Sequence, residues 1–362
     1  MKALRRYSLF AFGVACAHLI FGAIVRISGS GMGCGDHWPR CYGSFFPPLN
    51  RPDLIIEVSH RYLASILLLS LIGLAVAAYR RRAEPGVGGP GGVLRSATLA
   101  VALGFSAALL GAMTVKLGNA PFATLAHWTV AMSLVATVVA TVIRSGGFGG
   151  DVARSAAASA RTQRASYAAA GMALLAVIMG GLTAKYPGAA VACRAFPLCG
   201  PNPDVVAGAV HIQLTHRVLA MLLILHLAFG VVLPMRRRRE APLFRRAALI
   251  ALSLGLVQLL IAGAMIGMHL PPVLRSLHEA TGVSIWIATF ALAYLARISG
   301  DPLGVFARMR PNAPVHAGAG VLVPNGAMAS SDASDADRWR SAPPDGKEPW
   351  QNLGKLDPGT PP

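Results

Sequence analysis

The sequence is poor in charge, and in acidic residues above all. Asp, Glu, Lys and Arg make up only 13% of the 362 residues, about half of the roughly 25% that is usual in soluble domains. Acidic residues number 15 against 33 Lys and Arg, whereas hydrophobic residues make up 54% of the chain. This composition argues against a soluble globular protein and favours an integral membrane protein.

Several motifs are missing as well. The loop cysteines lack the two-residue spacing typical of zinc sites, since six residues separate Cys34 from Cys41 and five separate Cys193 from Cys199. The glycine-rich stretch at 29–35 has neither the lysine nor the strand–turn–helix context of a phosphate-binding loop. Because no basic patch is interleaved with aromatic residues, the net charge of +18 does not call for a nucleic-acid partner.

Long apolar runs are what the chain has in abundance. A run of some 20 residues can cross a bilayer core of about 30 Å, and such runs predict an all-α membrane protein with eight spans. These lie at about 9–27, 56–79, 96–116, 122–143, 167–184, 209–233, 247–268 and 276–296.

Basic residues gather in alternate connections, for example at Arg80–Arg82 and Arg236–Arg239. Because cytoplasmic loops carry the excess of Lys and Arg, both termini are predicted to be cytoplasmic. The two loops with paired cysteines then face the oxidising side, where a disulfide in each is expected and free thiols or a redox-active pair are the alternatives. Cys16 lies within the first span and is expected to be a small core residue.

An internal repeat organises the chain. The stretch Glu57–Ala64 (EVSHRYLA) returns as Gln213–Ala220 (QLTHRVLA), each time after a loop with two cysteines. Each copy also precedes a later span with a histidine near its start. The repeat predicts two tandem, parallel four-helix halves. The expected boundaries are 1–143 and 166–298 for the halves, 144–165 for a flexible cytoplasmic linker, and 299–362 for a disordered cytoplasmic tail.

Four of the ten histidines match between the halves, and all four are expected at similar depth near the outer face: His60, His127, His216 and His278. Ionisable residues within a bilayer are costly and tend to mark function. Pairing His60 with His127, and His216 with His278, twice supplies the two imidazoles that a bis-histidine haem needs. The remaining histidines have no counterpart in the repeat or lie near the surface or in the tail, and are not expected to be ligands: His18, His37, His211, His226, His269 and His316.

The residues around His60 and His216 are alike in the two halves except at one position. Arg61 and Arg217 directly follow His60 and His216, and each either binds haem propionates or reaches to the interface as an ordinary arginine. Glu57, one turn before His60, has the uncharged Gln213 as its counterpart. A carboxylate beside a haem site can take a proton or stabilise positive charge, so chemistry is predicted in the first half and a resident cofactor in the second. The alternative for Glu57 is an outer-face residue that is solvated at the start of its helix.

With its eight spans, four placed histidines, Glu57 before His60 and two cysteine pairs, the sequence resembles the haem A synthase family over roughly residues 7–298. The resemblance implies oxidation of the C8 methyl group of haem O to a formyl group, giving haem A for cytochrome c oxidase. It implies haem O as the substrate at His60 and His127, with Glu57 required nearby, and haem b as the cofactor at His216 and His278. It also implies disulfides within the two cysteine pairs.

The expected location is the bacterial cytoplasmic membrane, in contact with lipid and with the haem sites near the outer face. Haem O synthase and an electron acceptor are the partners that the resemblance suggests. Two other functions explain the same observations less well. A di-haem b-type cytochrome acting only in electron transfer is disfavoured because all four histidines cluster near one face. A transporter is disfavoured because the span interiors are mostly Ala, Leu, Val and Ile.

Overall fold

The computed structural model describes residues 1–200 and 202–300. Within them, eight helical segments are long and apolar enough to cross a membrane, which confirms the predicted all-α membrane fold. The chain is a multi-pass membrane protein. The segments are α1 (Lys2–Ile27), α2 (Pro52–Arg80), α3 (Val93–Lys116), α4 (Pro121–Arg144), α6 (Ala160–Lys185), the continuous run of α7 (Ala207–Leu225), η3 (His226–Val232) and α8 (Leu233–Arg237), α9 (Pro242–Gly267), and α10 (Pro272–Ile298).

The local sequence explains where many of these helices begin and end. Helices α2, α4, α9 and α10 start with a proline at the first helical position, where its fixed φ is suitable and its missing N–H is not needed. Helices α2, α4, α8 and α10 carry an arginine in the last turn, where its charge complements the helix dipole. These prolines and arginines set the helix limits a few residues beyond the apolar runs.

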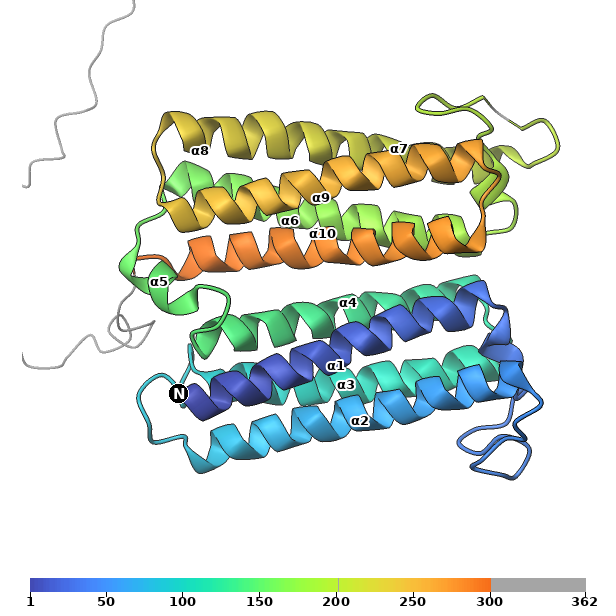
Figure 1. Cartoon of the computed structure of the whole chain (residues 1–362), viewed down its shortest axis with the longest axis horizontal. Helices are drawn as coiled ribbons and strands as arrows, with labels where there is room; N and C mark the ends of the chain where they lie inside the picture. The colour runs from blue at the N-terminus through green and yellow to red at the C-terminus, as the bar shows by residue number, and fades with distance from the viewer. Residues whose placement is uncertain (201, 301–362) are drawn as a thin grey trace, which may run out of the picture. The chain divides into compact units, whose positions relative to one another are not determined.

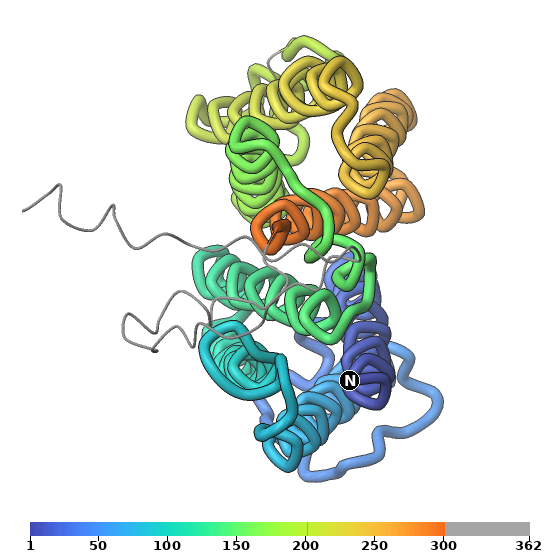
Figure 2. The backbone as a smooth tube through the Cα atoms, turned by 90° about the vertical axis from the view of Figure 1, so that its left-hand side faces the viewer, coloured from blue at the N-terminus to red at the C-terminus, as the bar shows by residue number. Residues whose placement is uncertain are grey.

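The helices form two groups of four, one from α1 to α4 and one from α6 to α10 (Figure 1). Viewed along the helices, the two groups lie next to each other (Figure 2). The arrangement is consistent with two tandem halves. The loops that carry the cysteine pairs, after α1 and after α6, lie at the same end of the bundle (Figure 1); we call this the cysteine-loop end, and the opposite end the basic end.

The halves meet mainly through α4, which packs against α6 and α10, and through α1, which packs against α10. In the most apolar 18-residue stretch of α4, 61% of the residues are buried, against 11% in that of α9. Helix α4 is therefore an interior helix and α9 a peripheral one. The indole Nε1 of Trp286 on α10 donates to the carbonyl oxygen of Met132 on α4 at 3.1 Å, which satisfies a buried donor at this interface.

A charged contact also joins the halves near the cysteine-loop end. The Arg26 guanidinium on α1 pairs with the Glu279 carboxylate on α10, and both side chains are only 14% exposed. The same guanidinium lies 5.7 Å from the ring centre of Trp128 on α4. Because Trp128 follows His127 and Glu279 follows His278, Arg26 contacts the neighbour of one predicted ligand in each half.

At the basic end, the expected linker is more ordered than its composition indicates. It contains a short helix, α5 (Gly150–Ser155), in which Ala153 is fully buried. Arg5 pairs with Asp151 across the basic end, and Arg154 donates to the carbonyl oxygen of Arg144 at 2.7 Å. These contacts hold the segment against both α1 and α4. Of the expected tail, residues 301–362 lie outside the described part of the chain.

The sixth span is continuous but not uniform. Its π-helical segment η3 lies just before Pro234, which has no N–H and whose ring disfavours the regular helical bond to the turn before it. His226 opens this segment, and its Nε2 forms a hydrogen bond of 2.9 Å with the carbonyl oxygen of Ala165 on α6. A Cβ at Gly230 would lie 2.7 Å from His226 Nδ1, so only glycine leaves room for this histidine. His226 therefore packs as expected and is not a ligand candidate.

Candidate functional site

The four predicted ligand histidines lie at one end of the molecule. Each falls within the first ten residues of its helix, α2, α4, α7 or α10, and each of these helices begins at the cysteine-loop end. In the second half, the ring centres of His216 and His278 are 6.3 Å apart and their planes are inclined by 76°. In the first half, His60 on α2 and His127 on α4 lie near the same end of their helices.

The spacing of the second-half pair suits a metal between the two rings. A metal–imidazole bond is about 2.0 Å long and the ring centre lies about 1.2 Å behind the bonding nitrogen, so two opposed imidazoles on one metal have centres roughly 6.4 Å apart. Within the described residues, no group of three or more His, Cys, Asp or Glu side chains is placed to hold a metal ion. Two imidazoles alone suit a haem, because the porphyrin supplies the other four ligands.

Glycines on the neighbouring helices make room for the histidine rings. A Cβ at Gly22 would lie 3.3 Å from Cε1 of His60, and one at Gly180 would lie 2.9 Å from Cε1 of His216. Gly111 stands in the same relation to His127, at 3.3 Å. Three of the four rings therefore lie against helix backbone, and a larger residue at these positions would displace the ring.

Two of the histidines have a fixed orientation. Nδ1 of His127 forms a hydrogen bond of 2.9 Å with the carbonyl oxygen of Ala107, and Nδ1 of His216 forms one of 2.9 Å with that of Ala176. A carbonyl oxygen can only accept, so Nδ1 carries the proton in both rings and Nε2 keeps its lone pair. This is the tautomer that binds a metal through Nε2, with the outer hydrogen bond that usually accompanies such a ligand.

Glu57 is buried, with a residue exposure of 4%, so it is not a solvated residue of the helix start. Its Oε2 accepts a hydrogen bond from the backbone N–H of Cys34 at 2.9 Å, and its Oε1 pairs with the Arg61 guanidinium at 2.5 Å. In the second half, Oε1 of Gln213 accepts from the backbone N–H of Cys193 at 2.5 Å. The two residues therefore attach the cysteine loop to the helix in the same way, and only the first half has a carboxylate there.

The two arginines contact the loops above the histidines. Arg61 donates to the carbonyl oxygen of Pro39 at 3.0 Å in addition to its pairing with Glu57. Arg217 has no such carboxylate partner among residues 1–200 and 202–300, and it donates to four loop carbonyls, those of Cys193, Ala195, Pro197 and Leu198. Both guanidinium groups hold loop backbone in this structure, and their contact with haem propionates stays a prediction.

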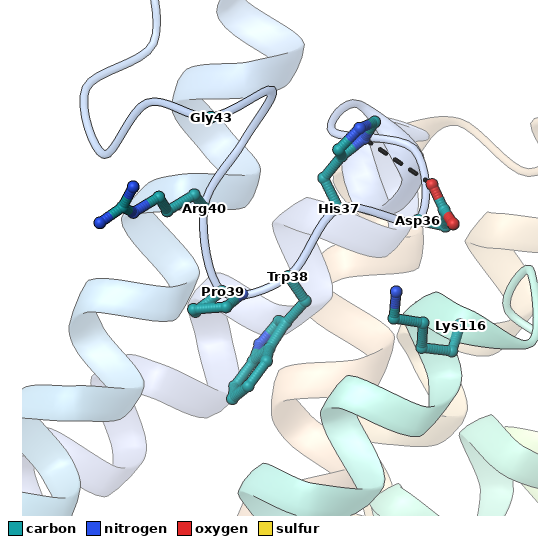
Figure 3. Close-up of a pocket in the computed structure, with 7 residues that line it drawn as sticks. All are labelled: Asp36, His37, Trp38, Pro39, Arg40, Gly43 and Lys116. Atoms are coloured by element: carbon teal, nitrogen blue, oxygen red, sulfur yellow. Dashed lines mark ion pairs between the residues drawn. The ribbon is translucent and has the colours of Figure 1, made fainter.

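Each cysteine loop is closed by the expected disulfide, Cys34–Cys41 in the first half and Cys193–Cys199 in the second. Cys16 is a free cysteine within α1, and it is half-buried instead of lying in the core as expected. The first loop also borders an open cavity of about 380 Å³, lined by Asp36, His37, Trp38, Pro39, Arg40, Gly43 and Lys116 (Figure 3). Its cationic groups come from the loop and from the end of α3, so the cavity opens at the cysteine-loop end of the first half.

Comparison with known proteins identifies the family. A profile of the family described as "Cytochrome oxidase assembly protein" matches residues 5–290. The chain belongs to this family. It is similar to the "Heme A synthase" of Geobacillus kaustophilus, at 29% identity over 67% of this chain and 75% of that protein. The proteins of that name from Geobacillus thermodenitrificans and Shouchella clausii are each 28% identical, over 68% and 72% of this chain and 77% and 84% of their own lengths.

One residue beside the candidate site of this cytochrome oxidase assembly protein was not selected from the sequence. His18 on α1, expected to be a packing residue, stacks on His60 with ring centres 4.3 Å apart and planes inclined by only 7°. His18 has no counterpart in the second half, so the repeat gave no reason to select it. The available signal was its position four residues before Gly22, the glycine that lies against His60.

Proposed function

We propose that this chain is a haem A synthase, which oxidises the C8 methyl group of haem O to the formyl group of haem A for cytochrome c oxidase. Membership of the cytochrome oxidase assembly family supports the proposal, as does similarity to proteins named "Heme A synthase". The single observation that carries it within the molecule is the difference between the halves. Both have a pair of histidines beneath a disulfide loop, but the residue that binds the loop backbone one turn before the first histidine is a carboxylate, Glu57, only in the first half.

In this proposal, His216 and His278 hold haem b as a resident cofactor, whereas His60 and His127 bind the iron of the substrate, haem O. The tautomers of His127 and His216, the glycines beside three of the rings and the 6.3 Å spacing of the second pair support the fit. When bound, a haem supplies an iron that changes oxidation state. The protein residues orient the two imidazoles and exclude water around them.

Glu57 is the proposed catalytic residue. It lies three residues before His60, so the two side chains project from nearly the same face of α2. The Cys34 N–H and the Arg61 guanidinium hold its carboxylate in place and leave it little freedom to turn away. From this position its negative charge stabilises the positive charge that develops at the methyl carbon during oxidation, or it accepts the proton that is released. Gln213 can do neither.

The protein lies in the bacterial cytoplasmic membrane with both termini in the cytoplasm, because arginines concentrate at the basic end. The cysteine-loop end then faces the oxidising side, in keeping with its two disulfides. Arg61 and Arg217 are the candidate propionate contacts, and haem O synthase and an electron acceptor are the proposed partners.

Expression in a host that makes haem O but no haem A tests the proposal. The purified protein is extracted, and its haems are identified by chromatography and mass. Haem b together with haem O and new haem A is the expected result. About two haem b per chain with no formyl product would instead support a cytochrome that acts only in electron transfer, a function disfavoured because both histidine pairs lie at the same end of their helices.

A further inference from the structure

Each of the four ligand histidines has one residue at the same place on a neighbouring helix. Ala107 lies 20 residues before His127 and contacts its ring nitrogen, and Gln258 likewise lies 20 residues before His278 and contacts its backbone. For His216 the residue is Ala176, four residues before Gly180. The equivalent residue for His60, four residues before Gly22, is His18.

The residues at these four positions contact their histidines in two ways. Where the residue is alanine, its carbonyl oxygen binds Nδ1 of the histidine at 2.9 Å. Where it is His18 or Gln258, the carbonyl bond is not formed. Nδ1 of His60 and Nδ1 of His278 are both buried and, within the described residues, have no hydrogen-bond partner. Each half therefore has one ligand fixed by the main chain and one that is not.

The two polar residues meet their histidines differently. Gln258 uses its amide Nε2 to donate to the carbonyl oxygen of His278 at 2.9 Å, so it is attached to the helix backbone and not to the ring. His18 places the face of its imidazole on that of His60, with ring centres 4.3 Å apart and planes inclined by 7°. Nε2 of His18 is itself buried without a hydrogen-bond partner among the described residues, so no polar contact explains why the ring is held there.

We propose that His18 is a positioning residue for substrate binding in the first half. The flat face of its ring fixes the plane of the His60 imidazole, in the place where a main-chain carbonyl fixes His127 and His216. With Gly22 against one edge of His60 and His18 against its face, the imidazole is confined although its Nδ1 has no anchor. The inference rests on the proposed function, since it concerns the histidine that would bind the iron of haem O.

The test separates the ring face of His18 from its nitrogen atoms. His18→Phe keeps a flat ring and removes both nitrogens, whereas His18→Ala removes the ring. Haem O is titrated into detergent-solubilised protein whose second half already holds its haem, and the apparent Kd is measured. The low-spin electron paramagnetic resonance signal of the added haem is recorded as well, because it responds to the orientation of the imidazole planes.

We expect His18→Ala to weaken haem O binding by about 10–100-fold, the usual effect of removing a residue that orients a metal ligand, and to shift the signal of the added haem. His18→Phe should bind within about threefold of the unchanged protein and keep its signal. The haem of the second half should remain in both variants, which reports that they are folded. Gln258→Ala is the matched control. Its apparent Kd for haem O in the first half should be within about threefold of that of the unchanged protein.

Two results would overturn the inference. One is unchanged haem O affinity and signal in His18→Ala. The other is loss of affinity in His18→Phe as large as in His18→Ala, which would assign the effect to a nitrogen atom. If His18→Ala also loses the second-half haem, His18→Leu, which keeps bulk without a flat face, replaces it with the same expectations. Failure of the unchanged protein to bind haem O in the first half would refute the proposed function and is a distinguishable result.

Discussion

Replacement of Glu57 by glutamine isolates the charge of the proposed catalytic residue. The carboxylate accepts hydrogen bonds from the Cys34 N–H at 2.9 Å and from the Arg61 guanidinium at 2.5 Å. Glutamine keeps an oxygen for the first contact, as Gln213 does for the Cys193 N–H. The change therefore leaves the loop attached and removes only the pairing of opposite charges.

The size of the two effects can be estimated separately. A hydrogen bond to a charged group contributes about 1.5–3 kcal/mol and a neutral one about 0.5–1.5 kcal/mol, so Glu57→Gln should lower the free energy of unfolding by about 1–2 kcal/mol. Proton transfer or charge stabilisation by a positioned side chain contributes about 10²–10⁴-fold to a rate. This corresponds to about 2.7–5.4 kcal/mol of activation free energy, at 1.36 kcal/mol for each tenfold. The loss of rate should exceed the loss of stability.

The assay is the rate of haem A formation per folded protein, with the haem content measured on the same sample. We expect Glu57→Gln to bind haem in both halves and to form haem A at least about 100-fold more slowly. Gln213→Glu is the matched control in the other half and should change the rate by less than about threefold. A Glu57→Gln protein that keeps half or more of the original rate would refute the catalytic role, and Glu57 would then serve only to attach the loop.

Three further predictions concern other parts of the molecule. Gly180→Ala places a Cβ 2.9 Å from Cε1 of His216, so the ring should be displaced and the haem content of the purified protein should fall from two per chain toward one; full content would contradict this packing. Arg26→Gln leaves the 14%-exposed Glu279 carboxylate without its partner and should lower the free energy of unfolding by about 3–5 kcal/mol, part of which Glu279→Gln should restore in thermal unfolding of the double variant. Cys193→Ser opens a disulfide across a sequence separation of 6 and should cost about 2–3 kcal/mol, whereas an unchanged rate of proteolysis in this loop would show that its hydrogen bonds suffice.

The helices could be predicted, and the four candidate histidines selected, because their signals lie within short stretches of sequence. Apolar runs mark the spans, prolines such as Pro121 and Pro272 mark their beginnings, and the repeated motif around His60 and His216 selects two ligand candidates. The sequence also pointed to Glu57 by its difference from Gln213. Each of these inferences depends only on residues that are close together in the sequence, whose relative positions on a helix are known.

The features that were missed depend on contacts between distant segments. The order of the 144–165 segment comes from pairings such as Arg5 with Asp151, which its own composition does not indicate. The stacking of His18 on His60 depends on the packing of α1 against α2, which the sequence does not show. From sequence alone, a single histidine in an apolar helix is most often a packing residue. The burial of Glu57 likewise depends on the loop that folds over it, through the N–H of Cys34.

The position of Arg26 has a thermodynamic consequence for the whole molecule. Arg26 contacts Trp128 and Glu279, each of which directly follows a ligand candidate of a different half. We expect a displacement of either helix, α4 or α10, along its axis to strain this contact. Because coupling between two binding sites is reciprocal, any factor by which an occupied second half favours binding in the first must return unchanged in the other direction. In the proposed function, binding of the substrate in the first half and of the cofactor in the second would then be two equilibria linked by the same factor.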